Sequence, residues 1–443
     1  MTDIADRRTN ENPYLAGNMA PVEEEITAFD LPVTGEIPAE LEGRWLRNGP
    51  NPMGEVDAAK HHWFMGSGMV HGVRLRGGKA EWYRNRYVDP KDEIGPNTNV
   101  GGFAGTTWAM VEAGQPPVEL DYELNPLGVN RFNDTLSGPF SAHPKYDAAT
   151  GELHAVTYQW PDLIDHLQYV VVGTDGKVTK TLDIPVDDMP MVHDMSLTDK
   201  YAIVYDLPVT VNFDLIAQGF GFPFAWAPDR AARVGLVPRD GTANDIIWCD
   251  VNPCYVFHPL NAYDAPDGTV VIDLCRYETV MTTEFRGPLS DGPTFDRWVI
   301  DPVAKKVHET TLDDRPQEFP RHNPKFGLKR HQFGYTAEFG PEQSNIHAAT
   351  LKVDVNNGIT QAHSYGFGRG GAEPIFVPKD GASEEDAGWI FSLVYDATTD
   401  QSELCILDAQ DFTGPEVARI HIPQRVPFGF HGNWVSDTSV PPN

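Results

Sequence analysis

Short apolar runs, separated by glycine, proline and aspartate, dominate the pattern of this chain. Five runs have the length and the β-branched or aromatic content of strands, and they cover residues 153–158, 168–172, 201–205, 269–274 and 389–395. Residues 171–178 predict a hairpin that turns at Asp175-Gly176, and Asp267-Gly268 and residues 301–306 separate similar ribbons. The pattern therefore predicts an all-β protein.

The spacing of the strands narrows the choice of architecture. Strand-like runs recur roughly every 8–12 residues, and stretches with helical periodicity are few. The 40 glycines and 37 prolines supply the chain-breaking residues that many short strands need. A β-propeller, a large barrel and a double sandwich all fit, because no Trp-Asp repeat or other clear period selects one of them.

The domain organisation is predicted to be simple. Residues 1–15 are expected to form a mobile N-terminal arm and residues 16–443 one domain, because no Ser/Gly linker, low-complexity tract or long charge run divides them. One segment is unusual, since from Phe213 to Pro228 the chain is aromatic and apolar but interrupted by glycine and proline. This irregularity predicts a loop and not a helix. The loop either folds over the core or forms an apolar entrance wall or a shallow lipid contact.

The charge balance restricts the partners. The chain has 443 residues, with 64 Asp+Glu against 34 Lys+Arg, which gives a formal net charge of −30. Nucleic acid is not expected as a partner, because phosphate binding requires a basic face. The excess negative charge predicts a soluble surface and carries no information about the fold.

Cysteine usage and the N-terminus bear on the compartment. The four cysteines are too few for a disulfide framework in so long a chain, so we expect buried free thiols at Cys249, Cys254, Cys275 and Cys405. The first twelve residues are polar and lack the apolar core of a signal peptide. No apolar run approaches the roughly 18 residues that cross a bilayer. A cytoplasmic location is therefore expected.

Four of the 15 histidines stand apart from the others, because each follows apolar or small residues at a strand or a strand end: His143, His193, His258 and His431. A buried imidazole costs free energy unless both ring nitrogens are engaged, and a metal on one nitrogen with a carboxylate or carbonyl on the other achieves this. The spacings of 50, 65 and 173 residues contain no local motif such as His-Glu-x-x-His. From spacing alone, a hydrogen-bonded core role and a metal site both stay open.

Seven blocks of residues give a more specific signal. Two lie near the N-terminus, at residues 38–52 (PAELEGRWLRNGPNP) and 62–71 (HWFMGSGMVH). The others are residues 191–194 (MVHD), 252–263 (NPCYVFHPLNAY), 313–321 (DDRPQEFPR), 373–378 (EPIFVP) and 425–432 (RVPFGFHG). In this order they resemble the signatures of the carotenoid cleavage oxygenases, a family whose members also cleave stilbenes and phenylpropenes.

The resemblance implies a fold and a metal site. The fold would be a seven-bladed β-propeller, with loops and short helices capping one face and a non-haem Fe(II) on the axis. The implied iron ligands are His143, His193, His258 and His431. Behind them the resemblance places carboxylates at Glu112, Glu318 and Glu373, and it places a catalytic residue, Thr98, beside the open coordination position. Neutral imidazoles suit Fe(II), and each glutamate can accept the distal N–H of a ligand histidine and fix its orientation.

The chain departs from the family pattern at two places. Met65 and Ser67 stand where the second signature usually carries acidic residues. Val111 stands where stilbene-cleaving relatives carry a phenol-binding lysine and several carotenoid-cleaving relatives carry an aromatic residue. The second departure disfavours a 4-hydroxystilbene substrate and leaves a carotenoid-type substrate open.

The resemblance implies an Fe(II)- and O₂-dependent oxygenase that cleaves the C=C bond of an apocarotenoid, or of a related conjugated or aryl alkene, into two carbonyl products. The alternatives are cleavage of a phenolic stilbene or phenylpropene, a retinoid-type isomerohydrolase, and a propeller scaffold without catalysis. The expected partners are O₂ and an apolar alkene. We also expect peripheral membrane contact through the segment from Phe213 to Pro228, and a monomer or weak dimer.

Overall fold

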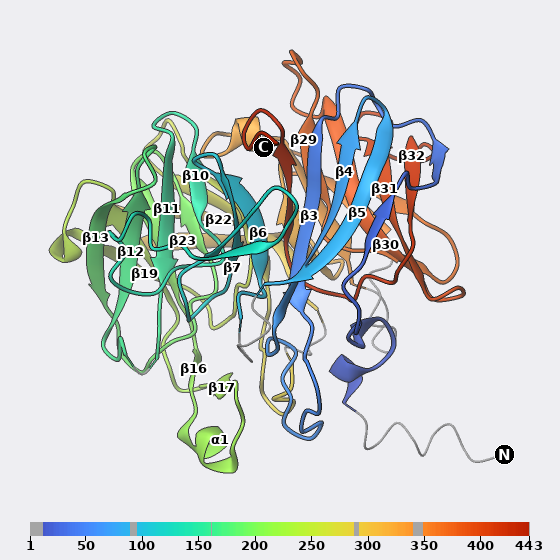
Figure 1. Cartoon of the computed structure of the whole chain (residues 1–443). Helices are drawn as coiled ribbons and strands as arrows, with labels where there is room; N and C mark the ends of the chain where they lie inside the picture. Colours follow the sequence, from blue (N-terminus) through green and yellow to red (C-terminus); the bar gives the residue numbers. More distant parts are fainter. Residues whose placement is uncertain (1–11, 89–94, 161, 288–291, 340–348, 443) are drawn as a thin grey trace.

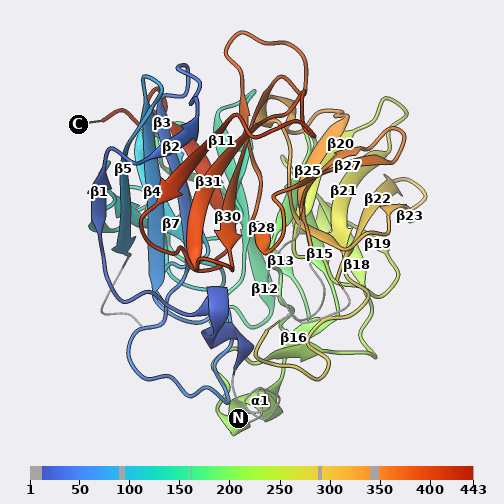
Figure 2. The ribbon, with the colours of Figure 1, turned by 90° about the vertical axis from the view of Figure 1, so that its right-hand side faces the viewer.

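Seven β-sheets surround a central axis in the computed structural model, which describes residues 12–88, 95–160, 162–287, 292–339 and 349–442 (Figures 1 and 2). Each of these sheets has four to six strands in the described residues, and a separate two-stranded sheet projects from one end of the molecule. The protein is therefore a seven-bladed β-propeller, as the resemblance implied. The strand pattern alone did not separate this fold from a barrel or a sandwich.

The first blade closes the ring by pairing strands from both ends of the chain. Its order is β1 (Thr27–Phe29), β5 (Lys79–Tyr87), β4 (Gly68–Arg76), β3 (Gly43–Pro50) and β33 (Gly432–Ser436). β33 pairs antiparallel with β3 over five residues. A Cβ atom on Gly432 would lie 2.1 Å from the carbonyl oxygen of Leu46, so this close approach requires glycine.

Five blades contain four strands each. The second and third comprise β6 (Asn99–Phe103), β7 (Thr106–Met110), β8 (Val118–Leu120) and β9 (Pro126–Val129), then β10 (Lys145–Asp147), β11 (Glu152–Thr157), β12 (His166–Val172) and β13 (Val178–Pro185). The fourth comprises β14 (Met195–Leu197), β15 (Tyr201–Asp206), β18 (Arg233–Pro238) and β19 (Ile247–Asp250). The fifth and sixth comprise β20 (Pro259–Asp264), β21 (Val270–Arg276), β22 (Thr294–Asp301) and β23 (Lys306–Asp313), then β24 (Gln317–Arg321), β25 (Phe333–Glu338), β26 (Ala349–Asp354) and β27 (Ile359–Ser364).

The seventh blade again combines distant parts of the chain. It comprises β2 (Val33–Gly35), β32 (Ala418–Ile422), β31 (Gln401–Asp408), β30 (Gly388–Asp396) and β28 (Arg369–Gly371), and β29 (Ile375–Pro378) also pairs with β30. The small projecting sheet is formed by β16 (Val209–Val211) and β17 (Phe224–Trp226). Short 3₁₀ helices η3 (Ala243–Asp245) and η4 (Pro324–Phe326) lie in connecting loops.

One strand of each blade lies next to the axis, and these inner strands touch their neighbours in adjacent blades. β33 contacts β6 and β29, β14 contacts β10 and β20, and β20 contacts β24. The side chain of Asn433 on β33 also donates to the carbonyl oxygen of Val100 on β6 at 2.8 Å. Asn99 on β6 donates to the carbonyl oxygen of Ala142, which precedes β10, at 2.7 Å. Arg321 on β24 lies 3.7 Å from Glu373, which precedes β29. The inner ends of the blades therefore form a continuous ring around the axis.

The strand predictions agree with the structure. The five predicted runs fall on β11, β12, β15, β21 and β30. The hairpin joins β12 to β13, and Gly176 turns it with a φ of +70°, a conformation that glycine adopts without strain. All four cysteines are buried and free, as expected.

The prediction of a loop from Phe213 to Pro228 was wrong in part. The segment begins with a short helix, α1 (Phe213–Gln218), and ends in β17. The Asn212 side chain accepts hydrogen bonds from the backbone N–H groups of Asp214 and Leu215, and Gly219 ends the helix at a φ of +83°. These two caps stabilise a helix of less than two turns, whose irregular sequence hides its periodicity.

The predicted N-terminal arm differs from the structure at its C-terminal end. Residues 1–11 lie outside the described residues. Residues 13–15 form the 3₁₀ helix η1 (Pro13–Leu15), followed by η2 (Gly17–Met19), and Asn12 and Tyr14 are buried. Tyr14 stacks on Trp63 with ring centroids 5.7 Å apart, so aromatic packing holds this part of the chain in place.

Helix α1 and the 3₁₀ helices η1 and η2 lie at one end of the propeller. In both views α1 lies at the bottom of the molecule, below β16 and β17, and the dark-blue turns of η1 and η2 lie at the same end (Figures 1 and 2). Among the described residues, no helix has the length and apolar character needed to cross a membrane. We call this end of the molecule the capping face.

Candidate metal centre

Each of the seven blades delivers one of the predicted site residues at or next to the start of its inner strand. These residues are Thr98 before β6, His143 before β10, His193 before β14, His258 before β20, Glu318 in β24, Glu373 before β29 and His431 before β33. The chain thus returns to the axis once per blade. This return explains how residues more than 100 positions apart can share one site.

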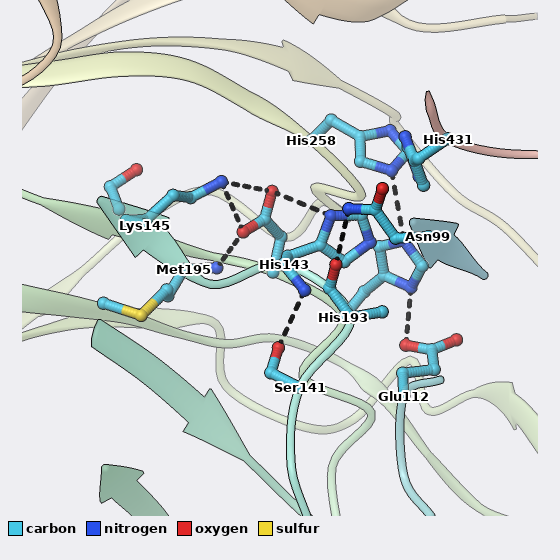
Figure 3. Close-up of polar contacts among 12 residues, drawn as sticks. Asn99, Glu112, Ser141, His143, Lys145, His193, Met195, His258 and His431 are labelled. Carbon is cyan, nitrogen blue, oxygen red and sulfur yellow. Dashed lines mark hydrogen bonds and ion pairs between the residues drawn. The ribbon is translucent and has the colours of Figure 1, made fainter. Parts of the chain in front are cut away.

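The four histidines meet on the axis. One ring nitrogen from each of them lies within 4.8 Å of the corresponding nitrogens of the other three, and all four residues are buried. The Nε2 atoms of His193 and His258 are 3.1 Å apart. Figure 3 shows the imidazoles converging on a common point.

Three of the imidazoles are each backed by a glutamate. Nδ1 of His193 lies 2.6 Å from Glu112 Oε2, and Nδ1 of His258 lies 2.6 Å from Glu318 Oε2. In each pair the carboxylate accepts the Nδ1–H, which leaves Nε2 with its lone pair directed to the centre.

The third pair joins His431 to Glu373. Nδ1 of His431 lies 2.8 Å from Glu373 Oε1, and the other carboxylate oxygen accepts the backbone N–H of Gly432 at 2.8 Å. Arg321 approaches the same carboxylate at 3.7 Å. This carboxylate is therefore held by one imidazole, one peptide group and one cation.

His143 is supported differently. Its Nδ1 lies 3.7 Å from Asp194 Oδ2, which is an ion-pair distance and not a hydrogen bond. Its backbone N–H donates to Ser141 Oγ at 3.0 Å (Figure 3). Its Nε2 atom is buried and has no hydrogen-bond partner. A buried nitrogen without a partner is costly, and a metal ion would satisfy it.

Burial sets the protonation of the histidines. It lowers the pKa of His143 and His258 well below the usual histidine range, and it lowers the pKa of His431 to about 4. For His193, burial acts in the same direction, but the Glu112 carboxylate outweighs it and raises the pKa. Three imidazoles are thus neutral at physiological pH, which is the form that binds metals.

The pKa values of Glu318 and Glu373 are shifted in opposite directions. Burial raises the pKa of Glu318 to about 8. Burial would also raise the pKa of Glu373, but Arg321 and His431 overcome it and lower this pKa to about 2. The difference follows the local charges, because a cation lies beside Glu373.

The donor set fits a divalent transition metal. A metal–imidazole bond of about 2.1 Å places two ligands at a right angle about 3.0 Å apart, and the Nε2 atoms of His193 and His258 are separated by 3.1 Å. Imidazole nitrogen suits iron, zinc and copper, and four such ligands leave positions free in an octahedral shell. The orphaned Nε2 of His143 gives independent support for an ion at this place.

Aromatic side chains cover the centre on the side of the capping face. We call this group the aromatic roof, and it consists of Trp63, Phe64, Phe222, Phe257 and Phe430. Phe64 makes edge contacts with Phe222, Phe257 and Phe430 at centroid distances of 5.2–6.1 Å. Phe257 and Phe64 lie 5.2 and 6.2 Å from the His193 ring. The roof excludes water and offers an apolar surface next to the histidines.

On the side of the inner strands the centre faces a cavity that is lined by both polar and apolar side chains. This cavity of about 350 Å³ is bordered by His143, His258 and His431, and its further lining includes Lys145, Asp194, Asn261, Arg321, His322 and Asn433. Phe319 also borders this cavity, and its ring lies 5.3 Å from both His258 and His431. The centre therefore has one aromatic face and one face where charged and polar side chains stand among apolar ones.

Thr98 and Val111, which the sequence analysis singled out, are both buried. The Thr98 hydroxyl donates to Asn97 Oδ1 at 3.0 Å, and the Thr98 carbonyl oxygen accepts the His431 N–H at 3.1 Å. Val111 is buried beside Glu112. The Tyr158 hydroxyl lies 3.5 Å from the Glu112 carboxylate.

Sequence reasoning assigned no role to Asp194 or Lys145, although both directly flank the histidine blocks. Asp194 follows His193, and Lys145 stands two residues after His143. The signal that could have found them is the pairing of opposite charges beside two candidate ligands. Their contact becomes visible only when adjacent blades are in place.

Comparisons with known proteins agree with this geometry. The family model described as retinal pigment epithelial membrane protein matches residues 19–94 and 89–436. A carotenoid cleavage oxygenase from Mycobacterium tuberculosis is 42% identical, over 98% of this chain and 99% of that protein. The chain belongs to the carotenoid cleavage oxygenase family. This family depends on non-haem iron, which agrees with the all-histidine donor set.

Solved structures of family members share the whole fold. The lignostilbene dioxygenase of Pseudomonas brassicacearum has a TM-score of 0.87 and 28% identity, and the match covers 96% of this chain and 98% of that one. A cobalt-substituted apocarotenoid oxygenase from Synechocystis has a TM-score of 0.83 and 26% identity, with coverage of 94% and 97%. The carotenoid cleavage oxygenase propeller is thus present over nearly the full length.

Proposed function

We propose that this protein is an Fe(II)- and O₂-dependent oxygenase that cleaves the C=C bond of an apolar alkene into two carbonyl products. The observation that carries the proposal is the group of four buried imidazoles with one nitrogen each within 4.8 Å of the others. Bound iron(II) supplies redox chemistry with O₂, for which the side chains alone have no equivalent. We assign His143, His193, His258 and His431 as its ligands.

The protein side chains orient and shield this chemistry. Glu112, Glu318 and Glu373 each accept the Nδ1–H of one histidine, so they fix the tautomer and the plane of the ring. Thr98 is assigned a place beside the open side of the centre, supported by the contact of its backbone with His431. No acid–base pair or nucleophile is needed for this reaction.

The aromatic roof supports an apolar, conjugated substrate. Rings in edge contact present both faces and edges to a polyene, and they can hold a double bond near the centre by packing alone. Relatives named for carotenoid and apocarotenoid cleavage agree with a substrate of this kind. Val111 lacks the amine that would bind a phenolate, so we propose an apocarotenoid or a related alkene without a phenol.

A substrate panel tests the proposal. Iron-loaded protein is incubated under ¹⁸O₂ with apocarotenoids, stilbenes and phenylpropenes, and the products are identified by mass. The expected result is two carbonyl fragments with ¹⁸O in product from the apocarotenoid, and none from His258→Ala. Phenolic stilbene as the preferred substrate would overturn the substrate assignment. Isomerised product without ¹⁸O, or protein that holds no iron, would overturn the oxygenase assignment.

We further propose peripheral contact with lipid through α1. Phe213 and Ile216 are exposed on this helix, 68% and 47% respectively, although both are large and apolar. The net charge of −30 disfavours anionic membranes, so the contact is apolar. Flotation with phosphatidylcholine vesicles should be lost in F213S/I216S and kept in F367S, which removes an aromatic ring that is 95% exposed elsewhere. Equal flotation of both variants would refute this contact.

We propose a cytoplasmic protein, and we propose that it is a monomer or a weak dimer. The strong net negative charge supports the proposed assembly, because it opposes self-association. Sedimentation at two protein concentrations tests the assembly. A stable dimer at submicromolar concentration would contradict it.

A further inference from the structure

His143 differs from the other three histidines in what stands behind it. The other three each have a glutamate oxygen within 2.6–2.8 Å of Nδ1. No glutamate of the described residues takes that place for His143, and the carboxylate nearest to its Nδ1 is Asp194 at 3.7 Å. Each metal-bound imidazole needs a partner at its distal nitrogen to fix the ring. The supporting group of the fourth histidine is therefore unassigned.

Asp194 is fixed in place more firmly than its distance to His143 suggests. Its side chain is 3% exposed, and both of its oxygens contact Lys145 Nζ, at 2.8 and 2.9 Å. One oxygen also accepts the backbone N–H of Met195 at 2.6 Å (Figure 3). The other oxygen is the one that faces His143. With its remaining contacts satisfied, the carboxylate cannot rotate away from the ring.

The pair also joins two blades at the level of the metal centre. Lys145 begins β10 two residues after His143, and Asp194 directly precedes β14 and directly follows His193. The Lys145–Asp194 contact thus ties together the two segments that carry two of the histidines. Any change in this contact alters the position of His143 relative to His193.

We infer that Asp194, clamped by Lys145, is the positioning residue of His143, in place of the glutamate that the other three histidines have. The inference rests on the metal-binding part of the proposed function and not on its substrate. A positively charged clamp has a physical reason here. Lys145 contacts both oxygens of the buried Asp194 carboxylate, so it compensates the charge of that carboxylate while holding its geometry.

Cobalt(II) titration of the metal-free protein tests this role. Cobalt gives a visible spectrum that responds to ligand geometry, and the readout needs no turnover. Asp194→Asn keeps the size of the side chain and removes its charge. We expect about 10-fold weaker cobalt binding, at the lower end of the usual effect of such partners, together with an altered visible spectrum. Cobalt affinity within twofold of wild type would overturn the inference.

Asp147→Asn is the matched control. Asp147 is also buried on β10, and it also joins the third blade to the fourth, through Arg239 at 2.7 Å, but it contacts none of the four histidines. A purely structural role predicts the same result for both variants. We expect that Asp147→Asn lowers the melting temperature and leaves the cobalt spectrum and affinity unchanged. An equal loss of affinity in both variants would contradict a positioning role.

Two further measurements keep the test decisive. In a His143→Ala background, Asp194→Asn should weaken cobalt binding by less than twofold further, because the ring it positions is gone; a full additional loss would refute the inference. If Asp194→Asn leaves Lys145 unpaired and does not fold, K145M/D194N removes both charges and should show the same loss of affinity. Absence of alkene cleavage in the wild type would overturn the proposed reaction but leave this comparison intact.

Discussion

Glu373→Gln isolates the contribution of one carboxylate behind the metal centre. Glu373 is buried, and its two oxygens accept from His431 Nδ1 and from the Gly432 N–H, both at 2.8 Å, with Arg321 at 3.7 Å. Glutamine keeps the volume but removes the charge, and its NH₂ group cannot accept from either donor. One donor therefore loses its partner, and Arg321 loses its counter-charge.

The contacts of Glu373 set the size of the expected losses in metal affinity and in stability. Loss of a partner behind a metal ligand typically weakens metal binding by about 10–100-fold, or about 1.4–2.7 kcal/mol. The carboxylate also stabilises the metal-free fold, because its pKa falls from 4.5 to about 2. A fall of this size corresponds to roughly 3 kcal/mol at neutral pH, as an upper bound. Since the folded-state pKa is the lower one, this stabilisation is complete above about pH 4.5 and disappears as the pH falls through about 2.

Metal titration and urea unfolding at several pH values measure both effects. Glu373→Gln should bind iron(II) or cobalt(II) at least about tenfold more weakly. Between pH 4.5 and 2 the metal-free variant should lose less stability than wild type, because the titrating group is absent. Glu403→Gln is the control. Glu403 lies on β31, outside the metal centre, and pairs with Arg369 and His421. Wild-type metal affinity in Glu373→Gln, or an equal loss in Glu403→Gln, would refute the reasoning.

Three further predictions test the site and the fold. His193→Ala and His258→Ala should each remove iron and activity together, as measured by elemental analysis and product formation, and full turnover without iron would contradict the ligand assignment. Thr98→Ala should lower kcat/KM, because Thr98 is assigned a place beside the open side of the centre. Iron content should stay at the wild-type level, because the Thr98 hydroxyl donates to Asn97. A parallel loss of iron would argue against a role at the open side. Trp298→Ala should lower the free energy of unfolding by about 3–5 kcal/mol in urea, because this fully buried ring fills the core between blades; a change below about 1 kcal/mol would show that the site collapses.

Several features of the site could be read from the sequence because they depend on neighbouring residues. The blocks around His193, His258 and His431 contain the histidine together with the small and aromatic residues that pack around it. Their order along the chain matched one family. Asp194 lay inside such a block, yet nothing in a single sequence connects it with Lys145, 49 positions earlier.

Helix α1, by contrast, could not be predicted from the sequence. Its six residues make less than two turns, so no apolar period can develop, and the caps at Asn212 and Gly219 decide its structure. The ordered residues 12–15 have a similar origin. Tyr14 is held by stacking on Trp63, which lies 49 positions later, and no local signal reports such a contact.

The strands and their turns could be predicted from the sequence, because alternation and turn chemistry are local properties. The four histidines became candidate metal ligands through the resemblance of the blocks around them to one family. The convergence of four distant histidines depends on the assembled blades. So do the glutamate contacts of three of them and the contact of the fourth with an aspartate that is clamped by a lysine. The physical reason is the closed ring of blades. Each inner strand lies next to the axis, and the pairing of β3 with β33 closes the ring that holds the blades in place.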